Sequence, residues 1–229
     1  MIKIDVICEG QSEAEFIKQV LQPAFDNTFY RFIPQTVVTS TDKRKGRVYK
    51  GGVSSFSKVE KDISNAMASV KAKNAFVTTM FDFYALPSDT PGFEEAKKLG
   101  SVYDKVACIE NAMKVRFNAE CFIPYIQIHE LETFQFADLN QLKTIYFEYQ
   151  DKFGPLEKCV KEFSNIEMIN NGPETAPSKR ILECIPDYDK VLLGIEAMRA
   201  IDFSVLRKKC SHFNEWITQL EQLKEIETE

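Results

Sequence analysis

Two short apolar segments, each followed at once by a carboxylate, constrain the fold of this chain most. Residues 2–8 (IKIDVIC) alternate Ile, Ile and Val with other residues and predict a strand, after which come Glu9 and Gly10. Residues 75–81 (AFVTTMF) form a nearly continuous apolar run, which is typical of a strand buried on both faces, and Asp82 follows them. The sequence therefore predicts buried strands with acidic side chains at their carboxyl ends.

Helical patterns alternate with these strands. Ser12 is predicted to cap the first helix, because Glu15 stands three residues later in the spacing of a capping box. Apolar spacing predicts the other elements, which are strands over residues 36–39 and 121–128, helices over residues 56–70 and 94–117 with an interruption near Gly100, and a helical turn over residues 129–136. Strands that alternate with helices favour an α/β fold with a mostly parallel sheet and right-handed crossovers.

The chain changes character near residue 138. Beyond it the pattern predicts helices over residues 141–151, 156–163, 178–184, 187–198 and 204–225. No long flexible linker precedes this part. We therefore expect an α/β domain over residues 1–138 and a helical extension over residues 139–229 that packs on it.

Composition limits the classes of function. Hydrophobic residues make up 44% of the chain, and the formal net charge is −5, so bulk charge does not favour nucleic acid. Any nucleic-acid contact would need local basic patches, a metal or a partner. The first residues do not form a signal peptide, no apolar run is long enough to span a bilayer, and the six cysteines are scattered without a C-x-x-C pair. We expect a cytoplasmic protein whose cysteines are buried thiols.

Glu9, Asp82 and Glu130 are all predicted at carboxyl ends of strands. In open α/β sheets the ligand crevice lies beyond these ends. A single strand-end carboxylate is more often a solvated or turn-forming residue, but like charges placed close together repel unless a cation lies between them. Hard divalent cations such as Mg²⁺ prefer such oxygen ligands. The sequence therefore predicts a metal site built on these carboxylates.

The segment HELE adds Glu132 to this set. If it is extended, Glu130 and Glu132 point to the same face, whereas in a helix they diverge by about 200° and only one reaches the site. The neighbouring His129 is better explained as a hydrogen-bonded structural histidine than as a catalytic group.

Basic residues offer contacts for phosphate. Lys43 and Arg44 lie in a glycine-containing basic stretch over residues 41–52, which predicts a flexible loop. Lys179 and Arg180 follow Ser178 at the expected start of a helix, where backbone amides could bind an anion. By composition alone, a solvated surface is the better explanation of both groups.

Five segments resemble a known family. They are CEGQSEAEFIKQVL (8–21), MFDFYALPSDTPG (80–92), PYIQIHELETFQFAD (124–138), PETAPSKRI (173–181) and KCSHFNEWITQLEQL (209–223). They are similar to the bacterial family called domain of unknown function 4276, whose N-terminal part resembles a Toprim domain. The resemblance implies a Toprim-like, mostly parallel sheet flanked by helices, with a helical C-terminal extension.

The Toprim pattern places a glutamate after the first strand and Asp-x-Asp after a later one, and together these residues bind magnesium. Glu9 matches the glutamate and Asp82 matches the first aspartate, but Tyr84 stands where the second aspartate would be. Glu130, Glu132 or Asp89 would have to supply the third ligand.

Two hypotheses follow. The first is a nuclease that depends on Mg or Mn and cleaves phosphodiesters of DNA or RNA. Its metal ligands and catalytic groups would be Glu9, Asp82 and Glu130 or Glu132. Lys43, Arg44, Lys179 and Arg180 would then contact the substrate. The resemblance adds a role in bacterial defence with an ATPase partner. The second hypothesis is a non-catalytic, Toprim-like binding or regulatory module, which Tyr84 and the acidic balance favour.

Overall fold

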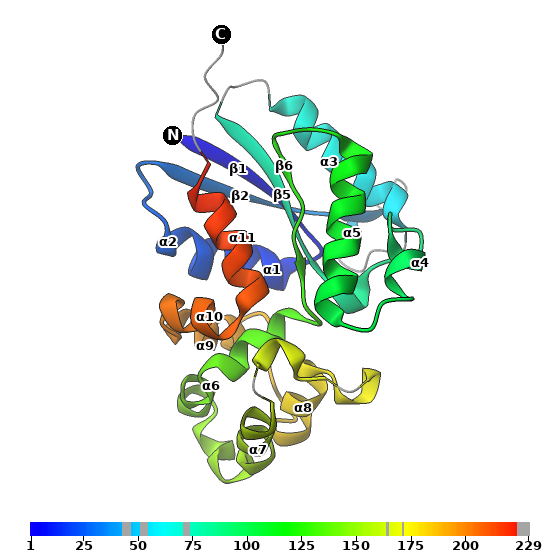
Figure 1. Ribbon diagram of the computed structural model, residues 1–229. Helices are drawn as coiled ribbons and strands as arrows, with labels where there is room; N and C mark the ends of the chain where they lie inside the picture. The colour runs from blue at the N-terminus through cyan, green and yellow to red at the C-terminus, as the bar shows by residue number, and fades with distance from the viewer. Residues whose placement is uncertain (43–46, 51–54, 71–73, 164, 171, 224–229) are drawn as a thin grey trace. The chain divides into compact units, whose positions relative to one another are not determined.

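The computed structural model describes residues 1–42, 47–50, 55–70, 74–163, 165–170 and 172–223 (Figure 1). The chain forms two compact units, which we call unit 1 (residues 1–127 with 221–229) and unit 2 (residues 128–220). The boundary at residue 138 and the packing of the helical part on the sheet stay predictions.

Unit 1 is built on a parallel sheet. Its strands are β1 (Ile2–Cys8), β2 (Tyr30–Thr36), β5 (Ala75–Asp82), β6 (Phe122–Ile123) and β7 (Ile126–Gln127). They follow the order β2-β1-β5-β6, β7 also pairs with β5, and every pairing in this sheet is parallel. Every residue of β5 is buried, as its apolar run predicted. The expected α/β fold, with a mostly parallel sheet flanked by helices, is confirmed.

The crossovers place helices on both faces of the sheet. The segment from α1 (Gln11–Phe16) through η1 (Ile17–Leu21) to α2 (Gln22–Ala24) connects β1 to β2 on one side of β1. The next crossover, which contains α3 (Phe56–Ser69), returns past β1 to β5 on its other side. Right-handed crossovers in opposite directions put their helices on opposite faces. Figure 1 shows α3 and α5 (Val102–Phe117) together on one face.

A chain that turns to opposite sides of β1 creates a topological switch point between β1 and β5. In sheets of this kind the crevice for a ligand opens at this point, beyond the carboxyl ends of the two strands. The end of β1 at Cys8 and the end of β5 at Asp82 therefore mark the position in unit 1 where a ligand is expected.

Pro124 breaks the strand that the sequence predicted over residues 121–128. The result is two short strands, β6 and β7, on either side of Pro124 and Tyr125. Threonines of β5 bridge the gap: Thr78 Oγ1 donates to the carbonyl of Ile123 at 2.5 Å, and Thr79 Oγ1 accepts from Tyr125 N at 2.9 Å. The break has a simple cause, because proline has no N–H to give to the ladder.

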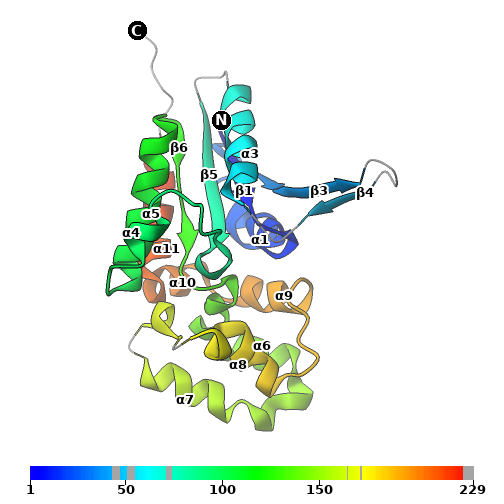
Figure 2. The same cartoon turned by 90° about the vertical axis from the view of Figure 1, so that its right-hand side faces the viewer.

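Two predictions between β1 and α3 were wrong. The strand expected over residues 36–39 instead spans the end of β2 at Thr36 and the start of the following strand at Val38. β2 contains Pro34, which the edge of the sheet tolerates. The loop expected over residues 41–52 contains parts of β3 (Val38–Asp42) and β4 (Arg47–Lys50), which pair as an antiparallel hairpin (Figure 2). Residues 43–46 and 51–52 of that stretch lie outside the described residues.

A helix-like segment, η3 (Leu131–Ala137), lies at the centre of unit 2. All seven of its residues are buried, and it contacts several of the surrounding helices. The rings of Phe134 and Phe213 lie 4.8 Å apart. The helices of this unit are α6 (Leu139–Ile145), η4 (Phe147–Lys152), α7 (Gly154–Glu162), η5 (Ile166–Met168), η6 (Pro173–Thr175), α8 (Pro177–Cys184), α9 (Leu193–Ala200), α10 (Phe203–Lys209) and α11 (Ser211–Glu221).

Two of the helices expected in unit 2 differ clearly from the structure. The single helix expected over residues 204–225 is broken at Cys210 into α10 and α11, and the one expected over residues 187–198 begins only at Leu193. Asp189 explains the later start, because its carboxylate accepts the amides of Val191 and Leu192 in a turn.

The cysteines and the lengths of the helices bear on two expectations from the sequence. All six cysteines lie in the described part of the chain and are free thiols, four of them buried. Over the residues that are described, no helix combines the length and the apolar character that crossing a membrane requires.

Candidate functional site

Glu9 and Asp82 stand at the ends of neighbouring strands in unit 1. Cys8 of β1 pairs in register with Met80 of β5. Glu9 follows Cys8 and Asp82 comes two residues after Met80, so the two are offset by one residue along strands that lie about 4.8 Å apart. The structure thus brings the two strand ends together at the switch point. That one cation contacts both carboxylates stays a prediction.

The two carboxylates approach this edge from different surroundings. Glu9 is half-buried and lines a small cavity of about 10 Å³, which has room for roughly one water. The rest of that lining includes Phe56 and Val59 of α3, Phe81 and Met113. Asp82 is only 7% exposed, and strand alternation directs it away from the face that carries Phe81. A shared ligand would therefore lie beyond the edge and not over one face.

Gly10 and Glu13 hold the turn after Glu9. Gly10 occupies the N-cap of α1, and its backbone N–H donates to Glu13 Oε2 at 2.8 Å. The prediction that Ser12 caps this helix was wrong, because the extended backbone continues only to Gly10 and the helix begins at Gln11. Glu13 is buried and serves this turn.

Two residues near Asp82 bear on the third ligand. Asp89 uses both carboxylate oxygens elsewhere: it accepts from Phe56 N at 2.8 Å and from Ser55 Oγ at 2.7 Å, and so caps α3. The hydrogen bond from Phe56, followed by that from Ser55, lowers the pKa of Asp89. Tyr84, at the position of the second Toprim aspartate, is 41% exposed. Neither residue adds a carboxylate that is available for a metal.

A divalent cation in unit 1 would have to be bound by carboxylate oxygens such as those of Glu9 and Asp82. Within the ranges that the structure describes, no group of three or more His, Cys, Asp or Glu is placed to hold a metal ion. Magnesium is commonly bound through one or two carboxylates together with phosphates of the substrate and water. Glu9 and Asp82 fit a magnesium site of this type, in which the substrate and water supply the remaining oxygen ligands.

In unit 2, Glu130 occupies the anion position that the sequence assigned to a phosphate. Its Oε2 accepts from the backbone N–H of Ser178 at 2.9 Å, at the start of α8. Arg180 donates its Nε to the carbonyl of Thr175 at 2.8 Å, and Lys179 is exposed. Lys43 and Arg44, the other predicted phosphate contacts, lie outside the described residues.

Glu132 is fully buried in unit 2. Its Oε1 lies 2.9 Å from Lys190 Nζ, and the lysine side chain reaches it from the surface. Burial raises the pKa of the Glu132 carboxyl; the Lys190 ammonium opposes this effect and the Glu130 charge adds to it. Glu130 and Glu132 thus have separate partners.

Two further residues around Glu132 were not among those predicted from the sequence. Gln135 is fully buried and donates to the carbonyl of Gly194 at 2.6 Å and to the Tyr188 hydroxyl at 3.4 Å. Burial, and then the nearby Glu132 charge, raises the pKa of Tyr188. Polar residues inside the otherwise apolar segment LETFQFA were the one available signal of a buried network.

His129 is buried at the start of unit 2. Its backbone is in the left-handed region, with φ at 63°, and burial lowers the pKa of the imidazole to about 4. The side chain is therefore neutral at pH 7. Its role as a hydrogen-bonded structural histidine stays a prediction.

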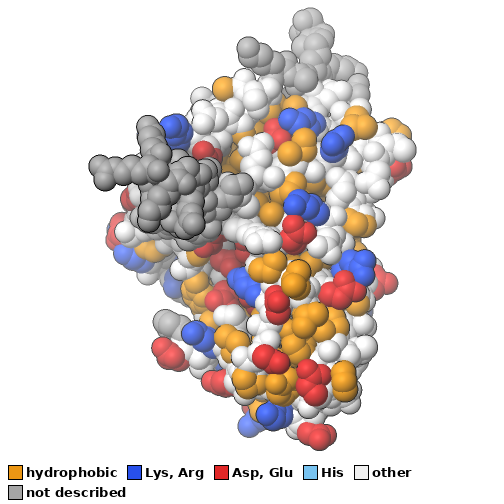
Figure 3. Space-filling view, turned by 180° about the vertical axis from the view of Figure 1, so that it is seen from behind, with side chains coloured by type: hydrophobic (Ala, Val, Ile, Leu, Met, Phe, Trp, Pro, Cys, Tyr) orange, Lys and Arg blue, Asp and Glu red, His pale blue; other side chains and the backbone are white. Residues whose placement is uncertain are grey.

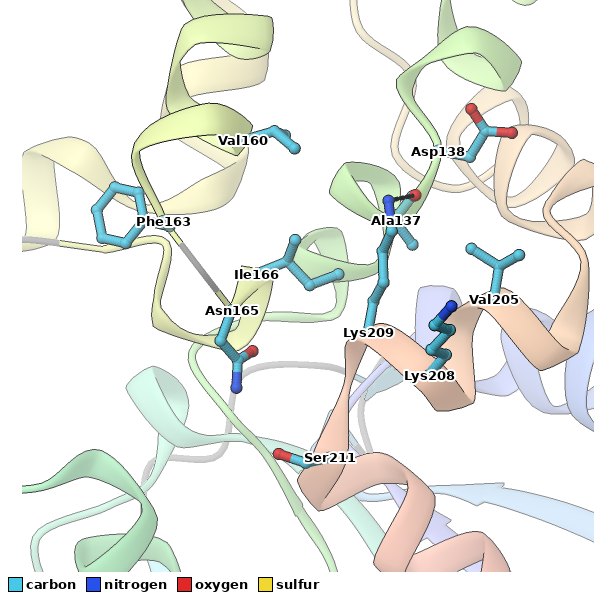
Figure 4. Close-up of a pocket in the computed structure, with 10 residues that line it drawn as sticks. All are labelled: Ala137, Asp138, Val160, Phe163, Asn165, Ile166, Val205, Lys208, Lys209 and Ser211. Atoms are coloured by element: carbon cyan, nitrogen blue, oxygen red, sulfur yellow. Dashed lines mark hydrogen bonds between the residues drawn. The ribbon is translucent and has the colours of Figure 1, made fainter.

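A cavity of about 670 Å³ lies in unit 2 (Figure 4). Its lining includes Val160, Ile166, Val205 and the stems of Lys208 and Lys209. Lys209 Nζ donates to the carbonyl of Ala137 at 2.6 Å, as Figure 4 shows. None of the acidic residues predicted from the sequence lines this cavity.

Comparisons with known proteins give one match. A family model described as "Domain of unknown function (DUF4276)" matches residues 8–221, which is most of the chain. No curated protein and no solved structure matches.

Proposed function

The chain belongs to the DUF4276 family, and from this premise we propose that unit 1 is a Toprim-like, divalent-cation-dependent phosphodiesterase that cleaves DNA or RNA. The observation that carries the proposal is the position of Glu9 and Asp82. They end two adjacent parallel strands on either side of the topological switch point, where α/β sheets bind their ligands.

The chemistry of these residues favours phosphoryl transfer. A bound Mg²⁺ or Mn²⁺ lowers the pKa of water and stabilises negative charge on a transferring phosphoryl group. In the proposed role Asp82, which β5 holds in a buried position, binds and orients the cation. Glu9 lines a water-sized cavity and would either bind the cation or hold the proton of the attacking water at a carboxylate oxygen.

The substrate must be held by local contacts. On the face seen in Figure 3, basic and acidic side chains are interspersed among apolar ones, and the net charge is −5. A surface of this kind does not attract a polyanion over a distance. The cation and a few lysines would therefore supply the affinity, or an ATPase partner, as in the resemblance, would deliver the nucleic acid.

A non-catalytic binding module is the second candidate. Tyr84 replaces the second Toprim aspartate, and Asp89 is engaged as the cap of α3. These two residues leave two carboxylates at the edge of unit 1, which is fewer than a site with two metal ions needs. Such a module would bind the cation and the nucleic acid without cleaving it.

The experiment is a cleavage assay with labelled single-stranded and duplex DNA and RNA in Mg²⁺, Mn²⁺ or EDTA. The wild type, Glu9→Gln and Asp82→Asn are compared with Glu120→Gln, in which an exposed glutamate of the same unit changes. We expect cleavage by the wild type and Glu120→Gln only with metal, and a loss of at least about 100-fold in the other two. Cleavage that survives EDTA and Glu9→Gln would rule the mechanism out, and no cleavage by any protein would favour the binding module.

A further inference from the structure

A second cavity lies directly after Asp82 in unit 1. It is lined by Phe83, Phe93 and Ala96 from the segment that follows β5, by Lys105 and Ile109 of α5, and by Lys97. Phe83 is the next residue after Asp82, so their Cα atoms are about 3.8 Å apart. The cavity is thus tied through the backbone to the edge where the proposed cleavage takes place.

The walls of this cavity are rigidly placed. Asp89 fixes the connecting segment to the N-terminus of α3, and Gly92 lets it pack tightly on α5. A Cβ at Gly92 would lie 2.8 Å from Ala112 Cβ, and its φ of +78° is one that side chains rarely adopt. Phe83 and Phe93 are therefore presented by a backbone with little freedom.

Charge and apolar surface are combined in the cavity. Two phenylalanine rings, Ala96 and Ile109 form the apolar part, and two lysines stand beside them. Lys97 is partly neutralised, because its Nζ lies 2.6 Å from Glu94 Oε1 and 4.9 Å from the centre of the Phe93 ring. Among the described residues Lys105 forms no ion pair, so its ammonium is available to an anion.

The size of the cavity limits which part of a ligand can enter it. Its volume is about 140 Å³, which has room for several waters. One flat heterocycle fits this volume, whereas a sugar and a phosphate must remain at the mouth. A ligand with an aromatic ring and an attached anion matches two phenylalanines beside a lysine, since bases stack on aromatic side chains.

We propose that this cavity is a nucleotide subsite, in which the base stacks against Phe83 and Phe93 and its phosphate binds Lys105. The inference rests on the proposed function and deepens it: the base next to the cleaved phosphodiester must leave its stack to enter the cavity. The substrate class is therefore single-stranded nucleic acid or an unpaired end.

The test is calorimetric titration of the full chain with adenosine 5′-monophosphate in EDTA. Adenosine and ribose 5-phosphate are titrated as fragments of the same ligand. We expect saturable binding of the nucleotide and weaker binding of both fragments. Lys105→Gln and Phe83→Leu should each weaken nucleotide binding by about 10-fold, because the first removes a charge-assisted contact and the second removes a stacking surface. Lys114→Gln, an exposed lysine in the last turn of α5, is the matched control and should bind as the wild type does.

The outcomes separate this inference from the proposed function. Since EDTA removes divalent cations, the titration does not depend on Glu9 and Asp82. No nucleotide binding by the wild type, or equal binding by Lys105→Gln and Lys114→Gln, would overturn the subsite even if the protein cleaves nucleic acid. Ribose 5-phosphate that binds as tightly as the nucleotide would also overturn it, since the base would then contribute nothing. Nucleotide binding without any cleavage would uphold the subsite and overturn the enzyme.

Discussion

Carboxylates that are equivalent in the sequence have different surroundings in the structure. The positions of Glu9 and Asp82 at strand ends followed from the hydrophobic pattern, because each apolar run stops where the carboxylate begins. The partner of Glu130 did not, since Ser178 lies 48 residues away. The burial of Glu132 could not be predicted from the sequence either, because polar residues in a segment normally indicate exposure, whereas η3 is buried throughout. Local pattern predicts where a charge stands along an element but not which distant group it meets.

His129 provides a prediction at this scale. Burial lowers its pKa from 6.5 to about 4, so between these values the unfolded chain binds a proton that the folded chain does not. The free energy of unfolding contributed by this residue is thus present above pH 6.5 and is lost as the pH falls towards 4, by up to about 3 kcal/mol. We expect His129→Asn, which remains neutral and tolerates the positive φ, to flatten the pH dependence of urea unfolding between pH 4 and pH 7. A variant with the slope of the wild type would show that His129 is not the group responsible.

At the scale of elements, periodic pattern gave the central strands and the long helices. β1, β5, α3 and α5 lie within a residue or two of their predicted bounds, and the interruption near Gly100 is confirmed. The errors fall where a single residue overrides the pattern. Pro34 in β2 concealed an edge strand, and the break at Cys210 lies within a run that is apolar at helical spacing. Tertiary contacts decide such cases.

Gly92 and Gly100 form a matched pair for testing the packing of the segment between β5 and α5. Gly92→Ala must adopt a positive φ and crowd Ala112, so we expect a loss of about 2 kcal/mol or more in the free energy of unfolding. Gly100→Ala meets nothing within 4 Å and should be neutral or stabilising by up to about 1 kcal/mol. Thermal and urea unfolding measure both variants, and equal effects would contradict the packing described here.

At the scale of the whole molecule, the sequence and the contacts place the division of the chain differently. The change in pattern near residue 138 marks where regular α-helices begin. The contacts assign the preceding segment η3 to unit 2, because its side chains are buried among α6, α8, α9 and α10. Sequence pattern could not supply this, since a short buried segment has no period that identifies its partners.

Two fragments test this division. A fragment of residues 128–220 keeps η3, with Leu131, Phe134 and Phe136, whereas a fragment of residues 139–229 loses it. We expect the first to show a cooperative thermal transition by circular dichroism and the second to show none, because removing several large buried side chains costs more than the stability of a small domain. A cooperative transition in the second fragment would support a boundary at residue 138.

Calorimetric titration of the protein with Mn²⁺ tests whether Glu9 and Asp82 bind a divalent cation. We predict one binding event in the wild type and in Glu120→Gln, and a loss of at least about 10-fold in affinity in Glu9→Gln and in Asp82→Asn, with all four proteins equally folded by circular dichroism. Unchanged Mn²⁺ affinity in both Glu9→Gln and Asp82→Asn would contradict a metal site at the ends of β1 and β5.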